Sequence, residues 1–123
     1  MMPKQPKPND KNALHLAWNR EMLTARNARS IADTSTEWSH LERAHILSQP
    51  LPLTHVRTHA AILGYGIRGR DLREIGGQLG RMLVAGPGSL TGRYPLGNTG
   101  GANVPATEVM PIPDDLQIVL GAD

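Results

Sequence analysis

Histidines and glutamates gather in one short stretch of the sequence, from Glu37 to His59, and this stretch strongly limits how the chain can fold. Four of the protein's five histidines lie in it, as two Glu-x-x-His pairs followed by one His-x-x-x-His pair. Residues three or four positions apart share one face of an α-helix. The stretch therefore predicts two consecutive helices that stack imidazoles and carboxylates, which is how helix bundles build metal sites.

Capping residues and prolines divide the first two thirds of the chain into about four helices. Asp10 is placed to cap the first helix. Thr34 and Glu37 match a capping box for the second, and Pro50 ends it. The predicted helices span residues 11–31, 35–49, 55–65 and 71–84.

The fourth predicted helix has an apolar side and a basic side. Its apolar side is predicted to face the core, and its basic side is predicted to face solvent. The apolar side comprises Leu72, Ile75, Leu79, Met82 and Leu83, and the arginines stand at positions 68, 70, 73 and 81.

Glycine and proline dominate the chain after Ala85 and preclude long helices there. The apolar residues of this part favour packing on the bundle, and Asp114 begins a short terminal helix. The fold class is therefore all-α: a small antiparallel bundle of about four helices, wrapped by a long irregular segment. The expected divisions are a mobile N-terminal arm (1–10), the helical bundle (11–85) and an irregular C-terminal extension (86–123).

Composition limits the partners of the chain. Its 123 residues suffice for one core, and the absence of Phe favours completing that core in a homodimer. A net charge of +2 gives no reason to expect binding to nucleic acid. No apolar run approaches the roughly 20 residues that span a bilayer. The first residues also lack the apolar region of a signal peptide, so we expect a cytoplasmic protein with no membrane partner.

Three histidines are predicted to meet inside the bundle. A helical wheel turns His45 inward on the second helix, and His55 and His59 inward on the third. If the two helices form an antiparallel hairpin, His45 lies opposite the level of the other two. Buried imidazoles need polar partners, and either a metal ion or a hydrogen-bonded core can supply them.

Three further residues of the same stretch are candidate metal ligands. His40 lies at the flank of the inward face, and Glu42 or Glu37 could complete the coordination or orient a ring. Glu37 fits the capping role equally well. The chain has no cysteine, so the donors are nitrogen and oxygen, which suit Zn, Fe, Ni, Co or Cu.

Six short motifs follow one another from about residue 37 to residue 116. They are His-Leu-Glu-Arg-Ala-His-Ile-Leu-Ser-Gln (40–49), His-Val-Arg-Thr-His (55–59), Arg-Asp-Leu-Arg-Glu (70–74), Pro-Gly-Ser-Leu-Thr-Gly-Arg (87–93), Gly-Asn-Thr-Gly-Gly-Ala-Asn-Val (97–104) and Met-Pro-Ile-Pro (110–113). Together they resemble the DUF3703 family of small bacterial proteins. The resemblance implies no established activity. It does imply a setting near heavy-metal resistance determinants, and it places His40, Glu42, His45, His55 and His59 at matching positions.

Three functions fit these patterns. The leading hypothesis is a metal-binding helical protein that acts as a sensor, chaperone or buffer in metal stress. The second is a mononuclear metalloenzyme of unknown substrate, with an open coordination position and the glycine-rich segment as its lid. The third is a tetratricopeptide-like interaction module without metal. Serine hydrolase chemistry has no support, because the sequence contains no Gly-x-Ser-x-Gly and singles out no serine.

Overall fold

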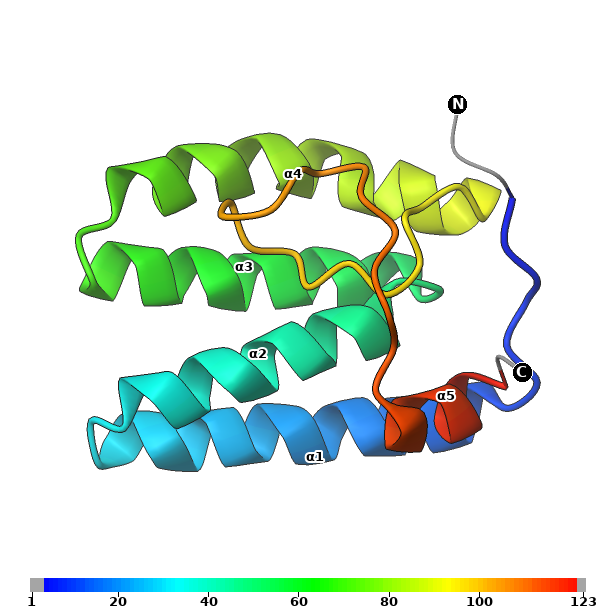
Figure 1. Ribbon diagram of the computed structural model, residues 1–123, viewed down its shortest axis with the longest axis horizontal. Coiled ribbons are helices and arrows are strands. Elements are labelled where there is room, and N and C mark those ends of the chain that lie inside the picture. Colours follow the sequence, from blue (N-terminus) through cyan, green and yellow to red (C-terminus); the bar gives the residue numbers. More distant parts are fainter. Residues whose placement is uncertain (1–3, 122–123) are drawn as a thin grey trace.

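In the computed structural model, which describes residues 4–121, four helices lie side by side in chain order and a short fifth helix packs beside the first two (Figure 1). The described helices are α1 (Lys11–Ser30), α2 (Thr34–Ser48), α3 (Pro52–Arg68), α4 (Leu72–Thr91) and α5 (Asp114–Leu120). Neighbours α1 and α2 form one antiparallel pair, and α3 and α4 form another. The described residues contain no sheet, only an isolated bridge between Lys4 and Arg93. The all-α prediction is confirmed.

The start of α2 differs from the capping box that we predicted. Asp33 is the N-cap, and its carboxylate accepts a hydrogen bond of 3.1 Å from the amide of Thr36. Thr34 is already the first helical residue. The carboxylate of Glu37 points across to α3 and pairs with Arg68 instead of returning to the helix start.

Both helices of the second pair are longer than predicted. Helix α3 begins at Pro52, because a proline fits the first turn, where its missing amide hydrogen is not needed. Helix α4 continues through Pro87 to Thr91, seven residues beyond the predicted end. It ends at Gly92, whose left-handed φ of 71° is a conformation that glycine adopts readily.

The apolar side of α4 faces solvent, so the predicted orientation of this helix is wrong. Leu72 is 82% exposed, Leu79 54% and Leu83 80%, while Ile75 and Met82 are half-buried. Three of the four buried positions of this helix are polar, namely Glu74, Gln78 and Ser89. The physical reason is that these polar side chains bind groups of α3 and of the chain that follows α4, which an apolar face could not satisfy.

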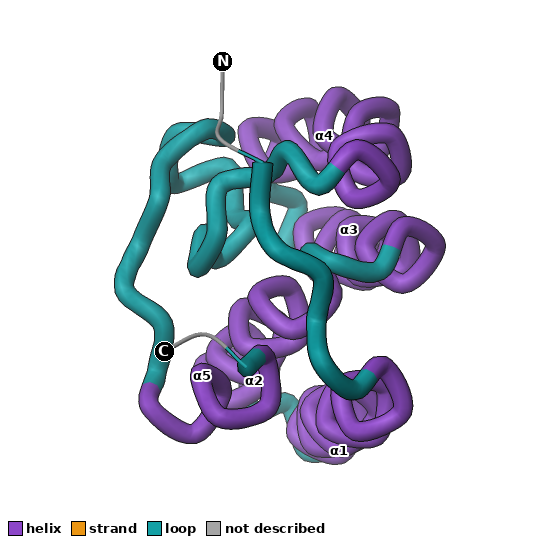
Figure 2. Tube along the Cα trace, turned by 90° about the vertical axis from the view of Figure 1, so that its right-hand side faces the viewer, coloured by secondary structure: helices purple, strands orange, loops and turns teal. Residues whose placement is uncertain are grey.

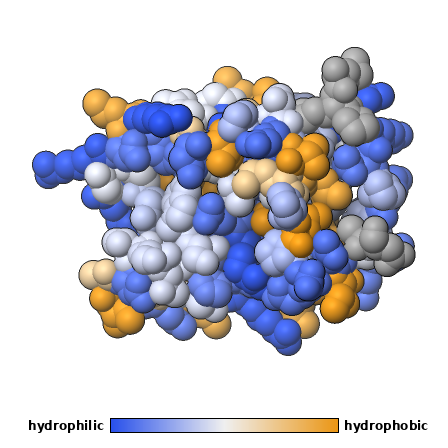
Figure 3. All heavy atoms as spheres, viewed as in Figure 1, coloured by the Kyte–Doolittle hydropathy of each residue, from blue (hydrophilic) through white to orange (hydrophobic). Residues whose placement is uncertain are grey.

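Residues 92–113, here called the covering segment, lie on one side of the four helices (Figures 1 and 2). Arg81 of α4 holds this segment by donating to the carbonyl oxygens of Gly100, Gly101 and Val104. Apolar atoms gather on the right-hand half of the face in Figure 3, where the segment crosses the helices. The prediction that the irregular segment wraps the bundle is confirmed.

The interior of the bundle combines apolar clusters with fully buried polar side chains. One apolar cluster comprises Leu14, Ile46, Leu47, Leu51, Leu116 and Leu120, and another comprises Ala25, Leu41 and Ile62. The polar side chains with almost no exposure are Ser48, Gln49, Thr58 and Gln78. Each buried polar group must be hydrogen-bonded, so these side chains fix the position of the helices relative to one another.

The ends of the chain were predicted to be irregular. Residues 1–3 of the expected arm and residues 122–123 of the expected extension lie outside the described residues. Further along the arm, the amide of Gln5 donates a hydrogen bond of 2.7 Å to the carbonyl oxygen of Gly92. None of the described helices is long and apolar enough to cross a membrane.

Candidate metal centre

Three imidazoles meet between α2 and α3. His45 comes from the last turn of α2, and His55 and His59 stand one turn apart on α3. Their Nε2 atoms are separated by 3.1 Å, 3.1 Å and 3.2 Å. All three side chains are buried. This histidine cluster has the inward placement and the common level that the helical spacing predicts.

Two of the rings are fixed from behind by groups that accept hydrogen bonds. Nδ1 of His45 lies 2.6 Å from the carbonyl oxygen of Asn98 in the covering segment. Nδ1 of His59 lies 2.5 Å from Oε1 of Gln78. The amide nitrogen of Gln78 donates to Glu74 and to the carbonyl oxygen of Gly100, so its oxygen is the atom that faces His59. Both rings therefore carry their proton on Nδ1.

The third ring is fixed through a hydroxyl group. Nδ1 of His55 lies 2.8 Å from Oγ of Ser89. That hydroxyl donates its own hydrogen to the carbonyl oxygen of Gln49, at 2.5 Å. Since its one hydrogen is used there, Ser89 accepts from His55, and this ring too is protonated on Nδ1.

The hydrogen bonds behind the rings determine what the cluster presents at its centre. With every proton on Nδ1, each Nε2 carries a lone pair, and the three lone pairs point at one another across 3.1–3.2 Å. No hydrogen lies between them, so these contacts repel. A cation at their meeting point turns the repulsion into coordination, and the three nitrogens belong to a group that could hold a metal ion.

The electrostatic setting keeps the cluster neutral. Burial, with a contribution from His59, lowers the pKa of His55 to about 3, and burial lowers the pKa of His59 to about 4. Burial and the two neighbouring rings push the pKa of His45 well below its ordinary value. The rings are therefore unprotonated at neutral pH, which is the form that binds metal.

A cavity of about 290 Å³ reaches the histidine cluster. Its walls come from α2, α3, the end of α4 and the covering segment. The three Nε2 atoms form a nearly equilateral triangle. Three nitrogen ligands at a metal–nitrogen distance of roughly 2.0–2.1 Å would leave at least one coordination position of a metal ion open.

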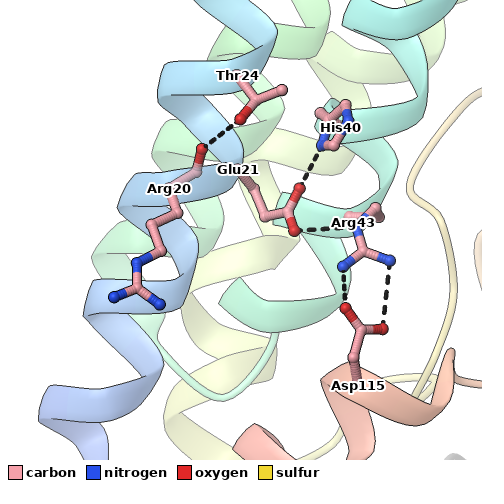
Figure 4. Close-up of polar contacts among 6 residues, drawn as sticks. All are labelled: Arg20, Glu21, Thr24, His40, Arg43 and Asp115. Carbon is pink, nitrogen blue, oxygen red and sulfur yellow. Dashed lines mark hydrogen bonds and ion pairs between the residues drawn. The ribbon is translucent and has the colours of Figure 1, made fainter.

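Two of the other predicted ligands lie elsewhere. His40 approaches Glu21 of α1, with 2.5 Å between Nδ1 and Oε2, and Glu21 also accepts from Arg43 (Figure 4). Arg43 in turn pairs with Asp115 of α5, so this group of charges ties together three helices. Glu37 pairs with Arg68. The structure does not bring His40 or Glu37 to the histidine cluster.

Glu42 lies one turn before His45 on α2 and is also outside the group of metal-binding atoms within 4.8 Å of one another. Burial raises the pKa of Glu42, while hydrogen bonds from Thr99 and Trp38 partly oppose this. Its contact with Thr99 connects α2 to the covering segment beside the site.

Sequence reasoning did not single out Gln78, Ser89 or Asn98, the groups that orient the rings. A signal for one of them was present: Glu74, Gln78 and Arg81 recur at helical spacing and form a polar side of α4 that needs partners inside the protein. Asn98 acts through its backbone oxygen. Every residue type has this oxygen, so the sequence does not reveal the role.

Comparison with known proteins extends the resemblance that the motifs suggested. The family model described as "Protein of unknown function (DUF3703)" matches residues 12–120, which includes every residue of the histidine cluster and of its supports. Searches of curated proteins and of solved structures found no match.

Proposed function

Since the chain belongs to the DUF3703 family, whose function is unknown, we propose from the site itself that the protein binds a transition-metal ion through Nε2 of His45, His55 and His59. One observation carries this proposal. Three separate acceptors force three buried imidazoles into the tautomer that aims a lone pair at a common point. A core that merely buried histidines would pair each Nε2 with a donor.

The donor set narrows the choice of metal. Three neutral nitrogens in a buried site suit Zn²⁺, Cu²⁺, Ni²⁺, Co²⁺ or Fe²⁺. Calcium and magnesium prefer oxygen ligands, and the group of potential donors that the described residues bring together contains no carboxylate. We therefore expect a first-row transition metal rather than a hard cation.

The wider proposal is a role in metal stress, as a buffer, chaperone or sensor. We also propose that the protein acts as the homodimer expected from its composition. The burial of the ligands under the covering segment supports slow, controlled exchange of the metal. The setting near heavy-metal resistance determinants that the family resemblance implies is consistent with this role.

A second candidate function is a mononuclear metalloenzyme. The cavity of about 290 Å³ that adjoins the cluster favours it, because a purely structural metal needs no space beside it. The open coordination position would then face this cavity.

Metal analysis of protein purified without a histidine tag tests the proposal. We expect one ion per chain in the wild type and none in His55→Ala or His59→Ala. The matched control is His15→Ala, because His15 is exposed on α1 and should leave the metal content unchanged. His40→Ala and Glu42→Gln test the wider set of ligands predicted from the sequence, and we expect them to retain the metal.

Thermal unfolding supplies an independent measurement. With free metal at about 100 times the dissociation constant, ligand binding stabilises the folded state by about 2.7 kcal/mol, which is roughly a 10 °C rise in melting temperature. This rise should vanish in His55→Ala and persist in His15→Ala. If the wild type binds less than a tenth of an ion per chain and its melting is insensitive to all five metals, the metal proposal fails and the interaction module is favoured.

A further inference from the structure

Among the described residues that line it, the cavity beside the histidine cluster carries positive charge and no negative charge. Arg81 and Arg93 belong to its wall together with the three histidines, and the guanidinium of Arg81 donates to carbonyl oxygens of the covering segment. No Asp or Glu belongs to this part of the wall. The carboxylate of Glu74 lies behind Gln78, where it accepts from Gln78 and, at 2.6 Å, from the amide of Ala102, and its negative charge acts on Arg81.

A divalent metal at this site would have no anionic ligand among the described residues. The three neutral imidazoles contribute no negative charge against the +2 of the ion. In a partly enclosed, weakly polar space such an excess of positive charge is costly, and an anion from solution is the direct way to relieve it. The remaining wall is largely apolar, with Val84, Ala85 and Pro87 among its residues.

We propose that the metal-loaded protein takes up a small carboxylate in this cavity, with one carboxylate oxygen on the metal and an apolar part along Val84 and Pro87. The inference rests on the proposed metal function. A small carboxylate and an inorganic oxyanion both offer a negatively charged oxygen to the metal. The apolar walls of the cavity favour the carboxylate.

The probe is the Co²⁺-loaded protein, because the visible absorption of Co²⁺ responds to a change of ligand. Acetate and butyrate should both alter the spectrum, and butyrate should bind roughly tenfold more tightly because it buries two more methylene groups. Inorganic phosphate should bind more weakly than butyrate. Val84→Asp adds a negative charge at the cavity and should weaken butyrate binding at least tenfold. Val109→Asp is the matched control, since Val109 is 61% exposed against 64% for Val84, and it should change nothing.

The outcomes separate the two proposals. If Co²⁺ does not bind, the metal function fails and this inference fails with it. If Co²⁺ binds but neither acetate nor butyrate alters the spectrum, the carboxylate site alone is overturned. Phosphate binding more tightly than butyrate would also overturn it, in favour of an inorganic oxyanion.

A second, independent observation concerns the outer face of α4. Leu72, Leu79, Leu83 and Leu90, here called the leucine row, are 82%, 54%, 80% and 76% exposed. On a helical wheel they lie within about 20° of the line opposite Arg81, the residue that holds the covering segment. Monomeric proteins rarely leave so long an apolar row in water.

The spacing of the leucine row is symmetric. The intervals are seven, four and seven residues, so the row reads the same in both directions about position 81. An antiparallel second copy would set Leu72 against the partner's Leu90 and Leu79 against the partner's Leu83, the reciprocal pairing of a two-fold interface. The leucines alone expose roughly 500 Å² per copy, a large share of the roughly 800 Å² per partner of a standard interface.

We infer that two copies of this chain dimerise through α4 in antiparallel orientation. Light scattering at about 10 and about 100 µM should give twice the chain mass of 13.3 kDa. Leu83→Lys should give the single mass, whereas Ile118→Lys on α5, with a similar exposure of 82% against 80%, should remain dimeric. A wild type that is monomeric at the higher concentration, or a dimeric Leu83→Lys, overturns the inference.

Cysteine crosslinking tests the orientation, because the chain has no cysteine of its own. Leu72→Cys mixed with Leu90→Cys should form covalent dimers under mild oxidation far more readily than either variant alone. Efficient crosslinking of Leu72→Cys with itself would mean a parallel arrangement and would contradict the antiparallel dimer.

Discussion

At the scale of single residues, Gln78 has the most connections in the site. Its oxygen fixes the ring of His59, and its nitrogen binds both Glu74 and the covering segment at Gly100. The path from His59 through Gln78 to a buried carboxylate makes the imidazole a better donor, because negative charge behind the ring favours its polarised form. The side-chain amide of Gln78 thus orients His59, raises its strength as a metal ligand and holds the covering segment.

Replacing Gln78 by Met keeps the volume of the side chain and removes both hydrogen-bonding ends. We expect the affinity for Zn²⁺ to fall roughly 10- to 100-fold, as is typical when a group that orients a ligand is lost. Competition with a chelating dye measures the change. Gln117→Met on α5, where the glutamine is half-buried and away from the cluster, should leave the affinity unaltered. Equal affinities for the two variants would show that Gln78 does not orient His59.

The histidine cluster also predicts how stability depends on pH. The pKa values of His55 and His59 in the folded protein, about 3 and about 4, lie below the ordinary 6.5. Below pH 6.5 the unfolded chain therefore binds more protons than the folded one. The free energy of unfolding of the metal-free protein should be at its plateau above about pH 6.5. It should decline as the pH falls, by up to about 1.4 kcal/mol per pH unit for each ring.

Urea unfolding between about pH 7.5 and about pH 4.5, in the presence of a chelator, measures this decline. His55→Ala should flatten the profile, since one of the titrating rings is gone, and His15→Ala should reproduce the wild-type slope. A wild-type stability that stays constant from about pH 6.5 to about pH 5 would contradict the neutral, buried state of the cluster.

At the scale of elements, the covering segment and α4 matter most. Gly100 packs so closely on the ring of His45 that a Cβ there would overlap the ring atoms, and its φ of +86° also favours glycine. The segment therefore approaches the site by its bare backbone. Gly97 and Gly101 are equally close to other neighbours, because a Cβ at Gly97 would overlap the backbone of Met110 and one at Gly101 the ring of Trp38.

Gly100→Ala should destabilise the protein by about 2–3 kcal/mol, because the new methyl group must displace either the segment or the ring. Metal affinity should fall as well, since the displaced segment carries the acceptor for His45. Gly64→Ala in α3 is the matched control: its new methyl group would meet no atom within 4 Å, and we expect a gain of about 0.5–1 kcal/mol. Chemical denaturation measures both. Gly100→Ala with wild-type stability and affinity would show that the segment does not pack on the ring.

At the scale of the whole molecule, the prediction from sequence succeeded where local spacing decides the outcome. Helical periodicity brought His45, His55 and His59 inward and to one level, since neighbouring helices in a hairpin must meet. The prediction from sequence failed for α4. An apolar stripe predicts that its own side of the helix is buried. It does not reveal that the opposite side is buried instead, because polar side chains there, such as Gln78, have hydrogen-bond partners inside the protein. The prediction also left His40 among the candidate ligands, because His40 has the same Glu-x-x-His spacing as His45, whereas in the structure it meets Glu21 on the preceding helix α1.

Metal binding should reduce the local opening of parts of the molecule that do not contact the metal. The covering segment reaches the cluster through Asn98 and Gly100, so fixing His45 and His59 also fixes their hydrogen-bond partners. We expect amide exchange in residues 97–104 to slow at least tenfold on adding Zn²⁺, and exchange in the first turns of α1 to remain unchanged. Hydrogen-exchange mass spectrometry checks this, and uniform protection of both regions would argue against local coupling.

Two of the three nitrogens stand one turn apart on α3, and the third comes from the preceding helix. Much of the centre thus exists as soon as α3 has formed, before the rest of the molecule is assembled. In a newly made chain, an ion held loosely by His55 and His59 would draw His45 in, and the metal would then guide the order of folding as well as stabilise its end point.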